Sequence, residues 1–168
     1  MPARKPEPHQ PENWLIGPNR WKLVKRPAGT DVIGLLQSQL DYGPTLLGDE
    51  TDRRSPRAFL RMVAHASFAL VAPNHVDWEV KKAYGSKPQI IARFALAGVS
   101  YGLRVTDPEF ERRLGHLDEG SYLISSASDS RVSDRFLLTI SLGEEYLGYH
   151  YKLVAGVIQM PERWKPYF

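Results

Sequence analysis

The sequence contains no cysteine, which excludes disulfide bonds and metal sites built from thiolates. It also contains no run of about 18 apolar residues, which a membrane-spanning helix requires. Residues 1–13 are polar and include four prolines, unlike the apolar segment of a secretion signal. The lack of cysteine fits a reducing compartment, and we expect a cytoplasmic protein with no membrane partner.

The chain also has only a small excess of positive over negative charge. The 168 residues include 22 Lys and Arg and 19 Asp and Glu, which gives a formal net charge of +3. Residues 1–66 have 10 basic and 7 acidic side chains, whereas residues 67–168 have 12 of each. A strong non-specific DNA-binding protein usually has a larger basic excess. Any basic binding surface must therefore be local, and an ordinary solvated surface is the alternative.

Hydrophobic residues make up 42% of the chain and charged residues 24%, which is typical of a globular domain. We divide the chain into an N-terminal lobe at 1–62, a β-rich domain at 63–160 and a C-terminal tail at 161–168. Residues 1–11 of the lobe are expected to be disordered.

The remainder of the N-terminal lobe is expected to be short and irregular. Thr30 or Asp31 is predicted to cap a helix over residues 32–40, where apolar side chains recur at helical spacing. Residues 41–56 are rich in Gly, Pro, Asp and Thr and predict an irregular linker.

From residue 67 onward the apolar pattern predicts strands. Phe94 and Leu96 alternate with Arg93, and Leu103 alternates with Arg104, which is typical of strands with one buried face. The predicted strands span residues 67–72, 89–97, 100–106, 136–142 and 149–159, with a weaker strand at 122–125.

A helix is predicted after the third of these strands. Thr106 or Asp107 is expected to cap it, Pro108 to begin it and Gly115 to lie near its end. Residues 143–148 are predicted to form a turn between the last two strands. This order is that of an OB barrel, with a helix between strands 3 and 4. The predicted fold class is mainly β, a five-stranded Greek-key barrel of the OB type with a short irregular α/β N-terminal lobe.

Three runs of sequence resemble the bacterial dual OB-containing domain family. They are His9-Gln10-Pro11-Glu12-Asn13-Trp14, then Val105-Thr106-Asp107-Pro108, and then Ser141-Leu142-Gly143-Glu144-Glu145 to Gly148-Tyr149-His150-Tyr151-Lys152-Leu153-Val154-Ala155. The last run is the most specific. The resemblance implies a nucleic-acid-binding or adaptor module, often found beside enzymes of bacterial genome conflict, with no established catalytic residues.

Two departures from the family pattern concern the first barrel and one position of the last strand. Family members carry further strands before residue 10, and they tend to have cysteine in place of His150. The resemblance therefore implies a complete second barrel and a truncated first barrel.

The run Gly98-Val99-Ser100-Tyr101-Gly102 matches the nucleophile-elbow pattern of serine hydrolases. That pattern requires a sharp turn from a strand into a helix, whereas the residues after Gly102 alternate as a strand. A tight hairpin explains Gly98 better. A hydrolase with Ser100 as nucleophile is therefore the least favoured alternative, and we expect no enzyme.

His75 and Asp77 are the best candidates for metal ligands in the sequence. A zinc site needs three or four ligands, and no pair of histidines has the i, i+4 spacing of ligands on a helix. Glycine motifs that bind phosphate or dinucleotides are also missing. We therefore predict a surface loop over residues 75–77, with no metal and no cofactor.

The candidate binding residues on the barrel follow from the alternation of the strands. Because Phe94 and Leu103 should point inward, Arg93 and Arg104 should point outward, where they can pair with phosphate. Ordinary solvated arginines are the alternative interpretation.

The last predicted strand adds two candidates to the same surface. Lys152 is predicted to face solvent, with Tyr149 within reach of the same ligand. Opposite faces of one strand cannot both be exposed, so Tyr151 is predicted to be a core residue.

Aromatic and basic residues also alternate near the N-terminus. Trp21 lies between Arg20 and Lys22, a pattern that suits base stacking combined with phosphate binding. Alternatively, Trp14 and Trp21 pack the N-terminal lobe against the barrel, because large aromatic side chains are usually buried.

The sequence thus supports two functional hypotheses. The first is a non-catalytic accessory module of a bacterial genome-conflict or defence system that binds single-stranded DNA or RNA. The second is an adaptor whose incomplete first barrel is completed by a partner chain through strand addition. The choice between DNA and RNA, the sequence preference and the oligomeric state stay open.

Overall fold

The computed structural model describes residues 28–51, 54–56, 67–82, 87–123 and 132–161. Its elements before the main sheet are α1 (Gly29–Ser38), the 3-10 turn η1 (Leu46–Gly48) and the short strand β1 (Arg54–Pro56). Among the residues described, no helix has the length and apolar character needed to cross a membrane.

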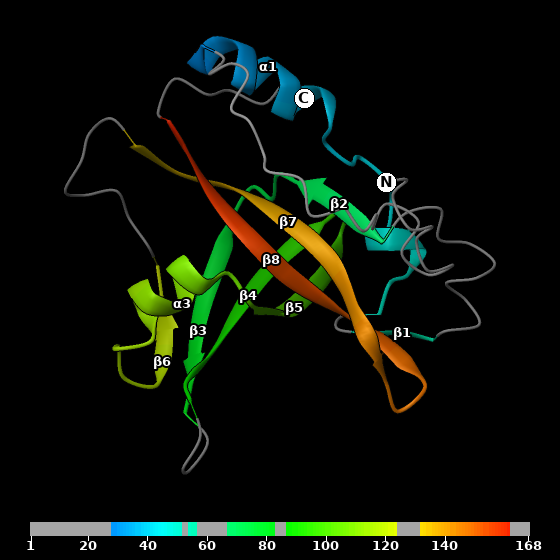
Figure 1. Ribbon diagram of the computed structural model, residues 1–168, viewed down its shortest axis with the longest axis vertical. Helices are drawn as coiled ribbons and strands as arrows, with labels where there is room; N and C mark the ends of the chain where they lie inside the picture. The colour runs from blue at the N-terminus through cyan, green and yellow to red at the C-terminus, as the bar shows by residue number, and fades with distance from the viewer. Residues whose placement is uncertain (1–27, 52–53, 57–66, 83–86, 124–131, 162–168) are drawn as a thin grey trace, which may run out of the picture.

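Strands dominate the rest of the protein, which is mainly β as predicted (Figure 1). The elements are β2 (Phe68–Val71), β3 (Val76–Lys81), β4 (Gln89–Leu96), β5 (Val99–Val105), α3 (Pro108–Leu114), β6 (Gly120–Tyr122), β7 (Val132–Tyr146) and β8 (Tyr149–Pro161).

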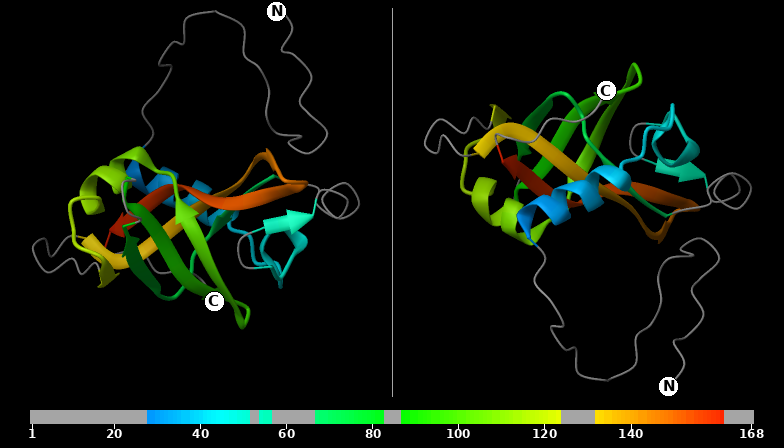
Figure 2. Two further views of the ribbon diagram at one scale, coloured as in Figure 1. Left: turned by 90° about the horizontal axis from the view of Figure 1, so that it is seen from below. Right: turned by 90° about the horizontal axis from the view of Figure 1, so that it is seen from above.

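The described strands join in one sheet of eight, in the order β2-β7-β8-β5-β4-β3-β6, with β1 paired to β8. β5 and β8 pair in parallel, and the other strand pairs are antiparallel. β2 is at one end of this path and β3 is near the other, yet only residues 72–75 separate them in the chain. The sheet therefore curls so that its two ends approach each other, and Figure 2 shows β7 and β8 crossing β3, β4 and β5.

Trp78 is at the centre of the core inside the curled sheet. It is fully buried, and its ring lies 4.2 Å from that of Phe110 on α3 and 5.3 Å from that of Phe136 on β7, measured between centroids. Phe110 and Leu114 are the buried residues of α3. The helix thus closes part of the core with the apolar side chains that its spacing places on one face.

The predicted helix after β5 is confirmed, including its cap. Asp107 Oδ1 accepts hydrogen bonds from the backbone N–H groups of Glu109 and Phe110, at 2.9 and 3.1 Å. Its other oxygen, Oδ2, accepts a 2.9 Å bond from the N–H of Val157 on β8. One carboxylate therefore satisfies the first turn of α3 and a backbone donor of the last strand.

The hairpin between β4 and β5 is also confirmed. Ala97 and Gly98 make its two-residue turn with φ values of 48° and 85°, as in the left-handed turns that match strand twist. Ser100 then lies on β5 and pairs with Ala95. The serine is therefore on an antiparallel strand and not on the strand-to-helix turn that a nucleophile elbow requires.

Two local predictions were wrong. Residues 75–77, expected as a loop, lead into β3, where Val76 and Val80 are buried and alternate with charged residues. The turn expected over 143–148 is reduced to Leu147 and Gly148, because β7 continues to Tyr146. Glu144 and Glu145 face solvent on β7, where the register with β8 shifts between Leu142 and Glu145.

The N-terminal elements pack on the main sheet. Helix α1 begins at Gly29, and no side chain caps it with a hydrogen bond. Its residues Ile33 and Leu36 lie against a small apolar cluster on the outside of β2, β7 and β8 (Figure 2). Leu46 and Leu47, within the segment expected to be a linker, belong to the main core. The division into an N-terminal lobe, a domain at 63–160 and a tail stays a prediction.

Candidate functional site

Arg93 and Arg104 project from one face of the β3-β4-β5 part of the sheet. Arg93 is opposite Asp77 on β3 and Gly102 on β5, and Arg104 is opposite Ile91. Opposed residues, and residues two apart on one strand, share a face. Both arginines are exposed, as predicted.

The interior positions predicted for these strands are also confirmed, except that Leu96 is only partly buried. Phe94, Leu103 and Val105 are buried, with exposed fractions of 6%, 0% and 0%. Their burial fixes the register of β4 and β5, and this register places the arginines outside.

Arg93 forms an ion pair with a carboxylate on the neighbouring strand. Its Nε atom donates a 2.9 Å hydrogen bond to Glu79 Oε2, and its Nη2 atom lies 2.8 Å from the same oxygen. The same carboxylate lies 3.5 Å from the ammonium of Lys81. The charge of Arg93 is therefore locally balanced.

Arg104 has a different environment. Its guanidinium forms no hydrogen bond or ion pair with any other residue that the structure describes. It lines a groove of about 330 Å³ that continues onto β8 and the β7–β8 hairpin, where Tyr146 and Tyr151 also line it. The two tyrosine rings are 6.3 Å apart, and 64% of Tyr146 is exposed. The groove thus combines an unpaired cation with accessible aromatic rings.

A second hollow, of about 440 Å³, adjoins Arg93 on the same face. Its lining includes His75, Asp77, Ser100 and Gly102. His75 Nε2 and Asp77 Oδ1 are 3.0 Å apart and share a hydrogen bond. Gly102 is opposite Arg93 and is buried. Among the described residues, no group of three or more metal-ligating side chains gathers at this hollow or elsewhere.

Lys152 corrects the prediction for the last strand. Its side chain is 1% exposed, and its ammonium donates to the carbonyl oxygens of Asp49 and Thr51 at 2.7 and 3.1 Å. It also lies 5.4 Å from the ring centre of Tyr101. Tyr151, predicted to be in the core, is only partly buried and lines the groove. The two faces of β8 are thus reversed, because the carbonyl groups that receive Lys152 come from a distant segment.

The other predicted residues have varied positions. Tyr149 is partly buried and pairs with Pro56 of β1 and with Tyr146. The N-terminal candidates Arg20, Trp21 and Lys22 are outside the described residues. Sequence reasoning missed Tyr146 as a site residue because it fell within the predicted turn.

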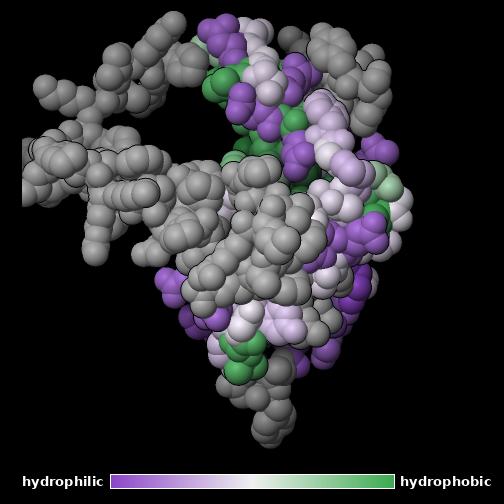
Figure 3. Space-filling model, turned by 90° about the vertical axis from the view of Figure 1, so that its right-hand side faces the viewer, coloured by the Kyte–Doolittle hydropathy of each residue, from purple (hydrophilic) through white to green (hydrophobic). Residues whose placement is uncertain are grey.

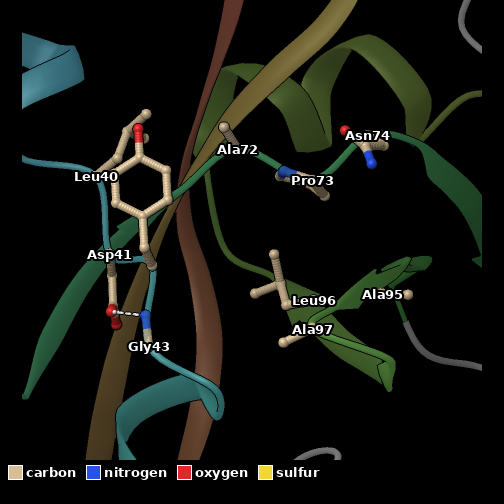
Figure 4. A pocket seen from close by; sticks show the side chains of 10 residues that line it. Leu40, Asp41, Gly43, Ala72, Pro73, Asn74, Ala95, Leu96 and Ala97 are labelled. Atoms are coloured by element: carbon tan, nitrogen blue, oxygen red, sulfur yellow. Dashed lines mark hydrogen bonds between the residues drawn. The ribbon is translucent and has the colours of Figure 1, made fainter. Parts of the chain in front are cut away.

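A third hollow lies between the α1–η1 connection and the β4–β5 turn (Figure 4). It has a volume of about 180 Å³ and is bordered by residues 40–43, 72–74 and 95–97. Asp41 is its charged residue, and Asp41 Oδ1 accepts a 2.8 Å hydrogen bond from Gly43 N–H. The small, acidic hollow offers no cation for a phosphate group.

Hydrophobic side chains form no broad patch on the side drawn in Figure 3. Among the coloured residues, hydrophilic ones predominate and hydrophobic ones form small groups, one of them near α1 at the top. On this side, the surface of the described residues favours polar or mixed contacts over a large apolar interface.

A curled, mainly β sheet that bears open hollows with charged and aromatic side chains defines a small β-rich binding module. The family model of the dual OB-containing domain matches residues 1–157, and the chain belongs to this family. The resemblance inferred from the sequence is therefore confirmed. No curated protein and no solved structure matches the chain.

Proposed function

We propose that β2 to β8 form an OB barrel in which β2 and β3 together make the first strand. β2 pairs with β7 and β3 pairs with β4, as expected for a first strand that bends and contacts two neighbours. β4, β5, β7 and β8 would then be strands two to five, with α3 between the third and fourth. The parallel pairing of β5 with β8 supports this assignment.

We propose further that this barrel binds single-stranded nucleic acid, with the groove around Arg104 as the main contact. The proposal rests on one observation: an exposed arginine without a partner among the described residues lines the same groove as Tyr146 and Tyr151. Phosphate would pair with the guanidinium, and a base would stack on the exposed ring of Tyr146. OB barrels use this face and the loop between the last two strands for oligonucleotides.

The remainder of the proposal concerns the biological role. Because the family resemblance implies no catalytic residues, we propose a non-catalytic accessory protein that acts beside enzymes of a bacterial genome-conflict system. Lys152 borders the groove but is buried, and its ammonium donates to the carbonyl groups of Asp49 and Thr51, so we assign it no contact with phosphate. Contributions from Arg20, Trp21 and Lys22 stay predictions.

The binding proposal can be tested by fluorescence anisotropy with labelled single-stranded DNA and RNA at low salt. Losing the charged hydrogen bonds of Arg104 should cost about 1.5 kcal/mol or more, so Arg104→Ala should weaken binding at least about tenfold. Tyr146→Ala should cost about 1–3 kcal/mol through lost stacking. Arg112→Ala is the matched control, because Arg112 is an exposed arginine on α3. If Arg104→Ala and Arg112→Ala weakened binding equally, the groove would not be the binding site.

A protein-binding adaptor is the second candidate. Within the described chain, β6 pairs with β3 alone and is at the end of the sheet, next to Leu123, which is 69% exposed. An exposed strand edge with an adjacent apolar side chain is suited to strand addition by a partner. Purification at low salt distinguishes the two: nucleic acid raises the 260/280 nm absorbance ratio, whereas a stoichiometric protein partner without nucleic acid favours the adaptor.

A further inference from the structure

Glu79 contacts two cations on the proposed binding face. Its Oε2 atom accepts a hydrogen bond from Arg93 Nε and lies 2.8 Å from Arg93 Nη2, and its Oε1 atom is 3.5 Å from Lys81 Nζ. The side chain of Glu79 is 23% exposed, compared with 51% for Arg93 and 46% for Lys81. The acid is therefore the most buried member of the group, and the cations are accessible to a ligand.

We propose that Glu79 acts as an internal competitor of the ligand's phosphate groups and thereby limits the affinity of this face. This inference rests on the proposed function. Arg93 and Lys81 are held by Glu79 in the free protein, so Arg104 provides the first contact. The face then binds a single strand more weakly than it would if Lys81, Arg93 and Arg104 were all free to contact phosphate.

The chemistry of the pair supports this competition. The guanidinium donors that bind a carboxylate oxygen are the same donors that bind a phosphate oxygen, with similar geometry. A phosphate that uses the Nε and Nη2 donors of Arg93 must displace Glu79, and one that uses Nη1 meets a charge that Glu79 already balances. The ion pair is partly exposed and weak enough for such exchange, because exposed pairs contribute at most about 1 kcal/mol.

The charge balance of the face leads to the same conclusion. Asp77 and Glu79 on the strands and Glu144 in the groove are acidic, and Lys81, Arg93 and Arg104 are basic, so these charges balance. Replacing Glu79 by glutamine keeps the size of the side chain, removes one negative charge and releases two cations. The change should raise both the affinity and its dependence on salt.

The test is a salt titration of the affinity of wild type and Glu79→Gln for a labelled single-stranded oligonucleotide. The variant should bind more tightly at 50 mM salt. For each new phosphate contact on a single strand, the slope of log K against log[salt] should steepen by about 0.7, so the advantage should shrink roughly 2.6-fold between 50 and 200 mM.

Two further variants separate competition from a general charge effect. Glu109→Gln removes the same charge but releases Arg112 on α3, and it should leave the affinity and the salt slope unchanged within about twofold. Adding Arg93→Ala and Lys81→Ala to Glu79→Gln should abolish the gain. Unfolding curves of all variants check that the fold is intact.

The results distinguish this inference from the function on which it rests. If wild type binds and Glu79→Gln binds no more tightly, the competitor role is wrong while the binding function stands. The role is equally wrong if Glu109→Gln gives the same gain, or if the gain persists without Arg93 and Lys81. If wild type does not bind the oligonucleotide, both proposals are overturned.

Discussion

Lys152 donates a 2.7 Å hydrogen bond to the backbone carbonyl oxygen of Asp49, which lies 103 positions earlier in the chain. Thr51 accepts a second bond from the same ammonium. Tyr101 adds to the contact, because its hydroxyl group accepts from Leu46 N–H at 3.0 Å and lies 3.4 Å from the Asp49 carbonyl. The last strand, β5 and the η1 segment are thereby joined through buried polar groups.

This contact predicts a structural role for Lys152. Lys152→Met keeps most of the apolar stem but removes the ammonium that donates to both carbonyl groups, so it should destabilise the protein by about 1–3 kcal/mol. Lys82→Met, at an exposed lysine paired with Asp118, should change stability by less than about 0.5 kcal/mol. Urea unfolding of the two variants measures the difference, and similar values for both would refute the role.

Asp107 provides a second prediction, because its two oxygens have separate partners. Asp107→Ala removes the helix cap and the acceptor for Val157 N–H, and should cost about 1–2 kcal/mol or more. Asp107→Asn keeps one acceptor oxygen for the cap and should cost less. Thermal unfolding monitored by circular dichroism tests this order, and equal losses in the two variants would contradict a stabilising role for the cap that asparagine retains.

The β4–β5 turn offers a stabilising change. Ala97 adopts a φ of 48°, which strains residues other than Gly, Asn and Asp. Ala97→Asn creates the Asn-Gly pair that two-residue hairpins favour, and should stabilise the protein by about 0.5–1 kcal/mol. Ala95→Asn, on the adjacent exposed strand position, is the control and should be neutral or destabilising. A lower midpoint of unfolding for Ala97→Asn would contradict the turn geometry.

The sequence predicted features that depend on local patterns. Asp107 and Pro108 indicated the start of α3, and the alternation around Phe94 and Leu103 indicated which way Arg93 and Arg104 point. Each of these signals is contained within a few residues, and each was confirmed.

Features that depend on distant partners were not predictable in this way. The orientation of β8 was reversed because Lys152 finds its acceptors at Asp49 and Thr51, far away in the chain. Leu46 and Leu47 appeared to lie in a polar linker, but they are buried in the main core. The pairing of Arg93 with Glu79 likewise depends on the register between β3 and β4, which the sequence pattern did not fix.

The central claim is that a single strand of nucleic acid lies in the groove formed by Arg104, Tyr146 and Tyr151. The most direct measurement is photo-crosslinking with an oligonucleotide that contains 5-iodouracil, followed by mass spectrometric identification of the crosslinked residue. The account predicts crosslinks to Tyr146 or Tyr151 that disappear at high salt and in Arg104→Ala. Crosslinks confined to α1 or α3, or none from an oligonucleotide that is bound, would contradict it.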